Sequence, residues 1–163
     1  LREVTLPRQR VAFVRYFGHL REQHHGWRRL RESLHDDPLS PPPMAIDLAH
    51  DDPEHYLGMP TRHDLCAPVP DGFVPHGRLG LQVLPGGRYL AITHYGPVEF
   101  LPFSYMHLAV HAAVRGLHRG PYPPLPYYVR HPSGPPADGA SFVTAEIILA
   151  GVPLGPAPEQ AEG

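Results

Sequence analysis

An internal repeat constrains the fold of this chain more than any other feature. Residues 6–20 read LPRQRVAFVRYFGHL and align without a gap on residues 84–98, which read LPGGRYLAITHYGPV. The match continues to place Trp27 against Tyr105. A chain that repeats itself in this way is expected to fold as two copies of one unit. The identical pairs are Leu6 and Leu84, Pro7 and Pro85, Arg10 and Arg88, and Gly18 and Gly96. The glycine that ends each segment is expected to have a positive φ at a turn.

Each copy has the periodicity of a strand followed by that of a helix. Side chains alternate in residues 11–17 and 89–92, as they do in a β-strand. Proline-rich connectors at 41–43 and 121–126 then exclude further helix. The helix faces predicted to be buried are Leu20, Trp27, Leu30 and Leu34 in the first copy, and Met106, Val110, Ala113 and Leu117 in the second.

Two extended segments complete each copy. In the first copy they are residues 45–52 and a strand that begins near Asp64. In the second copy they are residues 124–131 and a strand that begins near Glu146. The predicted unit is therefore a strand–helix–strand–strand module, and the predicted fold class is α+β.

The two copies are expected to share one antiparallel sheet. Each copy exposes a sheet face that it can bury only against the other copy, so a pseudo-two-fold axis should relate the halves and their two helices. A concave, largely apolar cleft on that axis is a typical place for a small-molecule site. The domain is predicted to span 1–155, with repeats at about 3–75 and 80–155 and a flexible tail at 156–163.

Composition and charge argue against several classes of protein. The net charge is −2, and the 14 basic residues are all arginines with no run beyond Arg28, Arg29 and Arg31, so the charge pattern of a nucleic-acid binder is missing. No apolar stretch approaches the roughly 20 residues that cross a bilayer. Cys66 is the single cysteine, which is compatible with a reducing cytoplasm. Any contact with DNA is expected to belong to a domain outside this chain.

A series of short motifs in a fixed order resembles one known family. They include Leu6-Pro7, Arg15-Tyr-Phe-Gly18, Trp27-Arg-Arg-Leu30, His50-Asp-Asp-Pro53, Arg62-His-Asp64, Pro68-Val-Pro70, Leu84-Pro-Gly-Gly-Arg88 and His94-Tyr-Gly-Pro97. In this order, the chain resembles the GyrI-like domain, which also serves AraC-type and MerR-type multidrug regulators as an effector-binding domain and forms stand-alone proteins that protect DNA gyrase. The resemblance implies a cleft between the halves, lined by aromatic side chains, often with a buried carboxylate that pairs with cationic compounds.

The chain departs from the family pattern at that carboxylate. The resemblance places the acid in a Phe-Glu-x-Tyr-like segment, and the corresponding stretch here is 125–128, where Pro126 stands in place of the acid and Tyr128 remains. Glu146, which precedes an apolar strand, is one candidate to supply the charge. Asp47, assigned as the first-copy counterpart of Pro126, is the other. Without either, neutral or anionic ligands are expected.

Aromatic side chains complete the predicted site. Trp27 and Tyr105 occupy equivalent places on the two helices, where they either stack on a flat ligand or belong to the core. Tyr127 and Tyr128 are consecutive on a strand, so one of them should face the cleft. The predicted ligand-binding residues are Trp27, Tyr105, Tyr128, Glu146, Asp47, Tyr16 and Phe17.

Metal binding and catalysis are not favoured by the sequence. His107 and His111 are one helical turn apart, but no third ligand is fixed by spacing, and a chance pair is the better interpretation. Ser104 and Ser141 lack the neighbours of a triad, and Cys66 has the setting of a small strand hydrophobe. No metal, cofactor or enzymatic activity is expected.

The leading hypothesis is an effector-sensing domain of a bacterial, cytoplasmic transcription regulator. It would bind an aromatic or amphipathic small molecule in the central cleft, and a homodimer is compatible with that role. One alternative is a stand-alone protein that contacts DNA gyrase. Another is a hydrolase of cyclopropane-type genotoxins, since the resemblance extends to enzymes of that kind.

Overall fold

The computed structural model describes residues 2–34, 44–51, 58–84, 86–97, 100–114, 127–132 and 142–149; for residues 127–128 and 142–149 it describes the course of the strands alone. The first half contains β1 (Arg2–Leu6), β2 (Gln9–Gly18), the short helix η1 (Leu20–Glu22), α1 (His24–Ser33), β3 (Ala45–Ala49) and β4 (Thr61–Pro68). The second half contains β5 (Gly80–Leu84), β6 (Gly87–Pro97), α2 (Leu101–Val114), β7 (Tyr127–His131) and β8 (Phe142–Leu149).

The predicted module is present twice. It consists of β2, α1, β3 and β4 in the first copy and of β6, α2, β7 and β8 in the second. All described strands belong to one antiparallel sheet in the order β1-β6-β8-β7-β3-β4-β2-β5. This order reads the same from both ends when the two copies are exchanged. The α+β class and the pseudo-two-fold arrangement are therefore confirmed, with the axis between β3 and β7.

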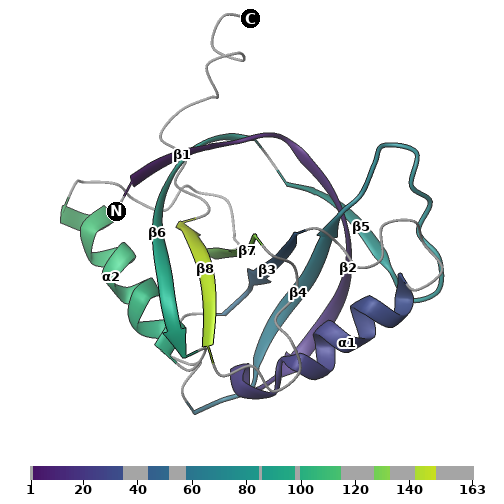
Figure 1. The fold of residues 1–163 in the computed structure, drawn as a ribbon, viewed down its shortest axis with the longest axis horizontal. Helices are drawn as coiled ribbons and strands as arrows, with labels where there is room; N and C mark the ends of the chain where they lie inside the picture. The colour runs from purple at the N-terminus through teal and green to yellow at the C-terminus, as the bar shows by residue number, and fades with distance from the viewer. Residues whose placement is uncertain are drawn as a thin grey trace, which may run out of the picture.

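The two short strands, β1 and β5, tie the copies together. β1 precedes β2 in the chain but pairs with β6, while β5 precedes β6 but pairs with β2. Each copy thus lends a strand to the other, and the leucines that end these strands, Leu6 and Leu84, are buried in the same core cluster. Figure 1 shows the sheet curling so that β1 and β2 close over its inner side.

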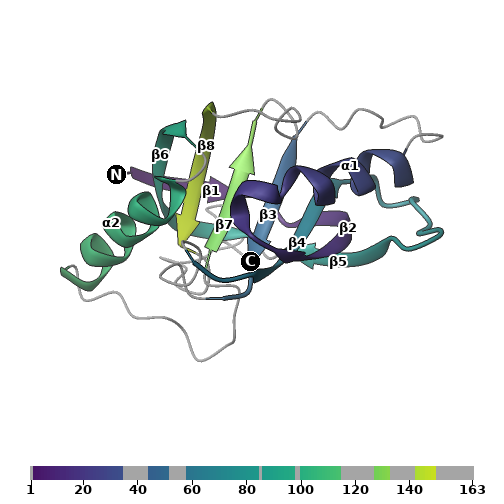
Figure 2. The same ribbon diagram turned by 90° about the horizontal axis from the view of Figure 1, so that it is seen from below.

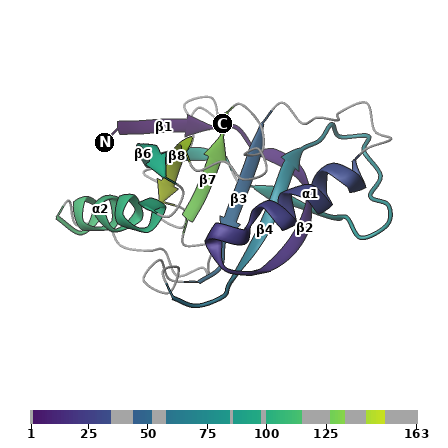
Figure 3. The same ribbon diagram turned by 60° about the horizontal axis from the view of Figure 1, so that its bottom comes forward.

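Both helices cover the outer face of the sheet. α1 packs on β2 and β4, and α2 packs on β6 and β8, with β3 and β7 between them (Figure 2). Figure 3 shows α1 lying across β4 and β2 on that side. Trp27 and Leu30 of α1 pack on Val14 and Leu65. The inner face has its own core cluster: Leu6, Val11, Ile46, Leu48, Cys66, Leu84, Tyr89 and Ala91.

The buried face of α2 differs from the periodicity-based prediction. Met106, Val110 and Ala113, which were predicted to be buried, are exposed, whereas Tyr105 and Leu108 are fully buried. Apolar residues also lie on the exposed side of the helix, so its periodicity does not single out one face. Leu117, the fourth residue predicted to be buried, lies outside the described residues. The repeat alignment assigns the face correctly, because Trp27, the match of Tyr105, is also buried. None of the helices in the described residues is long and apolar enough to span a membrane.

The two repeat glycines serve different purposes. Gly96 has a φ of 146°, as expected for a backbone conformation that L side chains rarely adopt. Gly18 has no positive φ, so that prediction is wrong for the first copy. A Cβ at Gly18 would lie 2.5 Å from Oη of Tyr16, whose hydroxyl donates a hydrogen bond to the His19 carbonyl. Close packing, rather than backbone conformation, accounts for glycine there.

Candidate functional site

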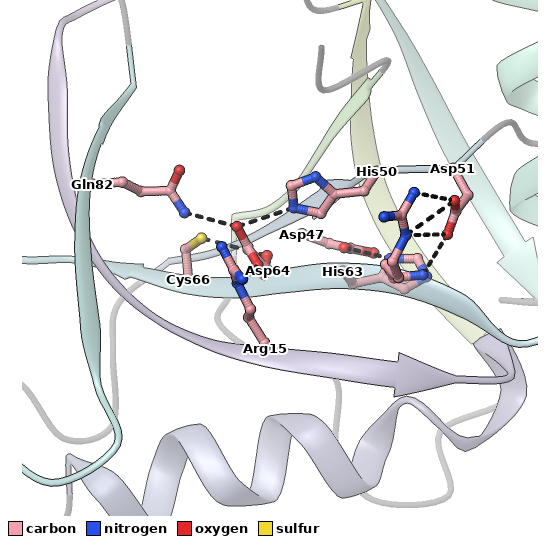
Figure 4. A network of polar contacts seen from close by, with 9 residues as sticks. Arg15, Asp47, His50, Asp51, His63, Asp64, Cys66 and Gln82 are labelled. Carbon is pink, nitrogen blue, oxygen red and sulfur yellow. Dashed lines mark hydrogen bonds and ion pairs between the residues drawn. The ribbon is translucent and has the colours of Figure 1, made fainter. Parts of the chain in front are cut away.

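Two aspartates on adjacent strands are buried on opposite faces of the sheet. Asp47 on β3 is 1% exposed, and Asp64 on β4 is 3% exposed. Leu48, not Asp47, pairs with Asp64 in the register of these strands, and side chains alternate along a strand. Asp47 therefore lies on the helix-covered face and Asp64 on the inner face. Figure 4 shows Asp64 with Arg15, His50 and Gln82, and Asp47 beside His63.

Asp47 has hydrogen-bond partners on both oxygens. Gln23 Nε2 donates to Oδ2 over 2.8 Å, and His63 Nδ1 lies 2.8 Å from Oδ1. The Gln23 amide oxygen in turn accepts the indole N–H of Trp27 over 3.3 Å. Because Gln23 precedes the first residue of α1, this network ties the start of that helix to the central strand. A buried carboxylate that is fully hydrogen-bonded stabilises the fold without needing a ligand.

The same network contains the order of groups found in nucleophilic triads. His63 Nε2 lies 2.8 Å from Thr61 Oγ1, so carboxylate, imidazole and hydroxyl follow one another. Thr61 and His63 are each 1% exposed. No substrate carbonyl can approach the Thr61 hydroxyl in this arrangement, so the relay is a structural one. Sequence spacing did not reveal it, because Asp47 joins the other two only through strand pairing.

His131 borders this network on β7. Its ring packs edge-on against the Trp27 indole, with 5.6 Å between centroids. Burial lowers the pKa of His131 to about 4, and the negative charge of Asp47 opposes this only in part. The imidazole is therefore neutral at neutral pH, as a core residue requires.

Asp64 is less completely satisfied than Asp47. Its Oδ2 accepts a hydrogen bond from Gln82 Nε2 over 3.1 Å and lies 3.0 Å from His50 Nε2. Its Oδ1 has no hydrogen-bond partner among the described residues; Arg15 Nε lies 3.6 Å away, as an ion pair. Burial alone would raise the pKa of Asp64, but the hydrogen bonds from His50 and Gln82 and the charges of His50 and Arg15 outweigh it and lower the pKa below its ordinary value.

A cavity of about 400 Å³ adjoins Asp64. It lies beside the last residues of β2 and β3 and the first residues of β4. Its lining residues are Arg15, Tyr16, Phe17, His50, Arg62, His63 and Asp64. Phe17 is 71% exposed, which offers an aromatic surface to a ligand. Arg62 is held in place by Asp51, with Nη2 and Oδ1 2.9 Å apart and the Arg62 backbone N–H on Oδ2 at 2.7 Å. The hydrogen bond from Arg62 lowers the pKa of Asp51.

A smaller cavity lies where the exchanged strands meet the central ones. Its volume is about 200 Å³, and its lining is Leu6, Pro7, Gln9, Met44, Ile46, Leu84 and Arg130. It draws residues from both copies, as a site on the pseudo-two-fold axis should. Its largely apolar wall ends at the guanidinium of Arg130, which suits an amphipathic molecule.

The strand register divides the predicted ligand-binding residues between the two faces. Trp27 (1% exposed) and Tyr105 (0%) are in the helix-side cores, and Tyr16 and Asp47 are buried on that side too. Phe17 lies at the Asp64 cavity. These residues do not converge on one cleft, and a ligand role for each stays a prediction.

Two predicted residues, Tyr128 and Glu146, are placed by register alone. Position 128 pairs with Leu48, and position 146 pairs with Thr93 and with Arg130, which assigns both positions to the inner face. Their ligand role also stays a prediction.

The register also corrects the counterpart of Asp47. Arg15 pairs with Asp64, and its repeat partner Thr93 pairs with Glu146, so Asp64 and Glu146 are equivalent. On the neighbouring strands, Asp47 pairs with the residue after Asp64, and Val129 pairs with the residue after Glu146, so Val129 is the equivalent of Asp47. These two residues pair directly across the axis. Pro126 is therefore not the counterpart; that residue itself lies outside the described residues.

Sequence reasoning missed Asp64 as a site residue although the signal was present. Glu146 was singled out as an acid that leads into an apolar strand, and Asp64 leads into Leu65, Cys66 and Ala67 in the same way. His50 and Gln82 could not be found from the sequence, since strand pairing alone brings them to Asp64. Among the described residues no group of three histidine, cysteine, aspartate or glutamate side chains could hold a metal, and His107 and His111 form only a ring contact.

The family follows from a match over most of the chain. The family model of the GyrI-like small molecule binding domain matches residues 1–138. This chain belongs to that family. The family resemblance is thus confirmed, and the GyrI-like fold accounts for the duplicated module. Comparison with curated proteins gives no match.

Solved structures share the fold at low sequence identity. The C-terminal domain of EcmrR has a TM-score of 0.65 at 17% identity, over 91% of this chain and 94% of that one. EcmrR in its complex with DNA has a TM-score of 0.67 at 16% identity; the match covers 93% of this GyrI-like chain and 56% of the EcmrR chain. A hydrolase from Listeria innocua has a TM-score of 0.59 at 11% identity, over 91% and 89% of the two chains.

Proposed function

We propose that this GyrI-like domain is the effector sensor of a transcription regulator and that its ligand binds on the inner face, anchored at Asp64. The ligand would be aromatic or amphipathic and would carry an ammonium or another hydrogen-bond donor. One observation supports this above the others: Asp64 is a buried, ionised carboxylate at the wall of a cavity, and no described residue donates a hydrogen bond to its Oδ1. A buried polar atom left in that state costs free energy that a ligand can recover.

Arg15 is the side chain that a ligand would displace. Its side chain is 82% exposed, and its Nε approaches Asp64 Oδ1 only to 3.6 Å. Because the Arg15 partner is largely in solvent, an ion pair of this length contributes little, so an ammonium group that donates directly to Oδ1 can take its place. The aromatic part of the ligand would then lie against Phe17. On this proposal Asp64 supplies the charge that Pro126 removes from the family pattern.

The link to transcription rests on the architecture of a relative. EcmrR is found in a complex with DNA, and the match to this chain covers 56% of the EcmrR chain. On this proposal a DNA-binding part of the full-length protein responds to the ligand-induced change. The domain itself would be non-enzymatic, since the triad-like relay found among the described residues, Asp47–His63–Thr61, is almost fully buried.

Calorimetry with matched ligands tests the proposal. Aromatic primary amines such as phenethylamine, protonated at neutral pH, are compared with neutral alcohols of the same shape, on the wild type and on Asp64→Asn and Asp51→Asn. We expect the amine to bind the wild type and Asp51→Asn, and to lose at least about tenfold in affinity on Asp64→Asn. Equal binding of amine and alcohol, unaffected by Asp64→Asn, would refute the anchor.

A further inference from the structure

A second concave feature, rich in arginine, lies away from the carboxylate of Asp64. It is an open groove of about 590 Å³ beside the outer edge of β2, lined by Val14, Arg15, Arg29, Glu32, Ser33 and Arg78. The lining contains three arginines and one acidic residue, Glu32, and Arg15 is shared with the Asp64 cavity. Its lining residues come from β2, from α1 and from the loop that connects β4 to β5; Figure 1 shows the ribbon of that loop beside α1. Its positive charge is local, because the chain as a whole carries a net charge of −2.

The strand edge and the helix fix the position of Arg29. β5 pairs with β2 only as far as Phe13, so the backbone of β2 beyond that residue has no strand partner on this side among the described residues. Arg29 Nη2 donates to the carbonyl oxygen of Arg15 over 2.6 Å. One nitrogen of the guanidinium is thereby used and holds the group at the groove, and no other described residue accepts a hydrogen bond from its remaining N–H donors.

Arg78 is brought to the groove by a turn. Gly77 has a φ of 59°, and the Leu79 N–H donates to the His76 carbonyl oxygen over 3.1 Å. Leu79 is buried in the core cluster that also contains Leu34, the residue after α1. The buried neighbour thus anchors the loop against the helix, while Arg78 itself makes no hydrogen bond or ion pair with the rest of the described chain.

The second copy shows that the fold does not require these arginines. The repeat places Thr93 at the position of Arg15 and His107 at the position of Arg29, while valine and histidine replace Glu32 and Ser33. The equivalent edge of β6 therefore has no arginine at these positions. Two surfaces with the same backbone differ in charge, so the cluster of arginines is a property of this groove alone.

We propose that the groove binds a small polyanion, a molecule that carries two or more phosphate or carboxylate groups. Guanidinium groups recognise such anions through paired, charge-assisted hydrogen bonds. The volume of the groove is within the range of small-molecule sites. The groove and the Asp64 cavity share Arg15 but none of their other lining residues, and an anion site in the groove does not require that a ligand binds at Asp64.

Titration calorimetry with two probes tests the site and separates its sources of anion. Inorganic tripolyphosphate is the phosphate probe and citrate is the carboxylate probe, each at fixed ionic strength. Arg29→Gln and Arg78→Gln remove one groove arginine each. Arg28→Gln is the matched control, because it removes the same charge from the same helix but does not line the groove. Circular dichroism verifies that each variant is folded.

The outcomes distinguish a specific anion site from nonspecific electrostatic attraction and from arginines that protect a strand edge against aggregation. We expect at least one probe to bind the wild type with one-to-one stoichiometry, each groove variant to lose about fivefold or more in affinity, and Arg28→Gln to stay within about twofold. Equal losses in all three variants would show diffuse attraction and overturn the proposal. Absence of binding at millimolar concentration would also overturn it. Aggregation of the Arg29→Gln, Arg78→Gln double variant, without wild-type binding, would assign the arginines to protection of a strand edge.

Discussion

Asp47 and Asp64 are both almost fully buried, yet their surroundings differ. Asp47 lies on the helix-covered face, and each of its oxygens has a hydrogen-bond partner. Asp64 lies on the inner face beside a cavity; among the residues that the structure describes, one of its oxygens has two partners and the other has only a long ion pair. Burial alone therefore does not identify a functional carboxylate. Incomplete hydrogen bonding next to a cavity does, because it leaves interaction energy for a ligand.

The duplication supports the same distinction. The equivalent of Asp47 is Val129, so the second copy keeps no acid there. The equivalent of Asp64 is Glu146, so both copies place an acid at that position. The carboxylate of Asp47 serves a local structural need of the first copy, the attachment of α1 through Gln23. The Asp64 position belongs to the repeated unit.

The largest expected effect is on stability, at Asp47. Asp47→Asn replaces a charged acceptor of two hydrogen bonds with an amide that cannot accept on both sides, which leaves Gln23 or His63 unsatisfied in the core. We expect a loss of about 3 kcal/mol in the free energy of unfolding, measured by urea denaturation. Asp51→Asn, at a partly exposed ion pair, is the control and should cost under about 1 kcal/mol. Similar losses in both variants would remove the structural role from Asp47.

The pH dependence of stability tests whether His131, on the helix-covered face, is buried in its neutral form. The pKa of His131 is lowered from 6.5 to about 4 in the folded protein. Between these values the unfolded chain binds the proton and the folded chain does not, so the free energy of unfolding should fall as pH falls through this window. The loss reaches about 3 kcal/mol at most.

A histidine substitution isolates this contribution. His131→Gln should flatten the decline between pH 6.5 and 4, as followed by urea denaturation at several pH values. The exposed His76, changed to glutamine, is the control and should leave the decline as it is in the wild type. A wild-type curve without any decline in this window would contradict the buried, neutral state of His131.

Asp64→Asn should have a small effect on stability and a large effect on ligand binding. Its partners are less deeply buried than those of Asp47, so we expect a loss of only about 1 kcal/mol in the free energy of unfolding. The affinity for a protonated aromatic amine should fall at least about tenfold, as measured by calorimetry. A variant that loses as much stability as Asp47→Asn while it keeps the amine would show that the two carboxylates have the same structural role.

The smallest expected effect is at Phe17. Because its ring is 71% exposed, Phe17→Ser should change the free energy of unfolding by no more than about 0.5 kcal/mol. Affinity for an aromatic amine should fall about threefold through loss of ring contact. Tyr95→Ser, at the equivalent exposed position of the other copy, is the control and should not alter binding. Equal losses from both would indicate nonspecific contact with exposed rings.

The sequence predicted the fold well, because a repeat fixes both the composition of the module and its symmetry. It predicted the buried face of α2 wrongly at Met106 and Val110, because apolar residues on both the buried and the exposed side of a helix do not indicate which side is buried. The exchange of β1 and β5 between the copies was not foreseen, since short strands carry little periodicity.

The candidate site was predicted only in part. Alternation along a strand separates two sets of side chains but does not say which set faces a cavity, so Asp47 and Phe17 entered one predicted site although they lie on different faces. Whether Trp27 belongs to a core or to a cleft depends on Gln23 and Asp47, which the fold brings to it. The partners of Asp64 come from two other strands and from the residue that follows a third, which no local pattern reveals.

The most direct test of the central claim compares the two carboxylates in one titration. The side-chain carboxyl ¹³C resonances of Asp47 and Asp64, assigned by substitution, are followed by NMR as phenethylamine is added at neutral pH. We expect the Asp64 resonance to shift with a saturable binding curve while the Asp47 resonance stays in place. A shift confined to Asp47, or saturation of the protein without any shift at Asp64, would contradict the assignment of the ligand to the inner face.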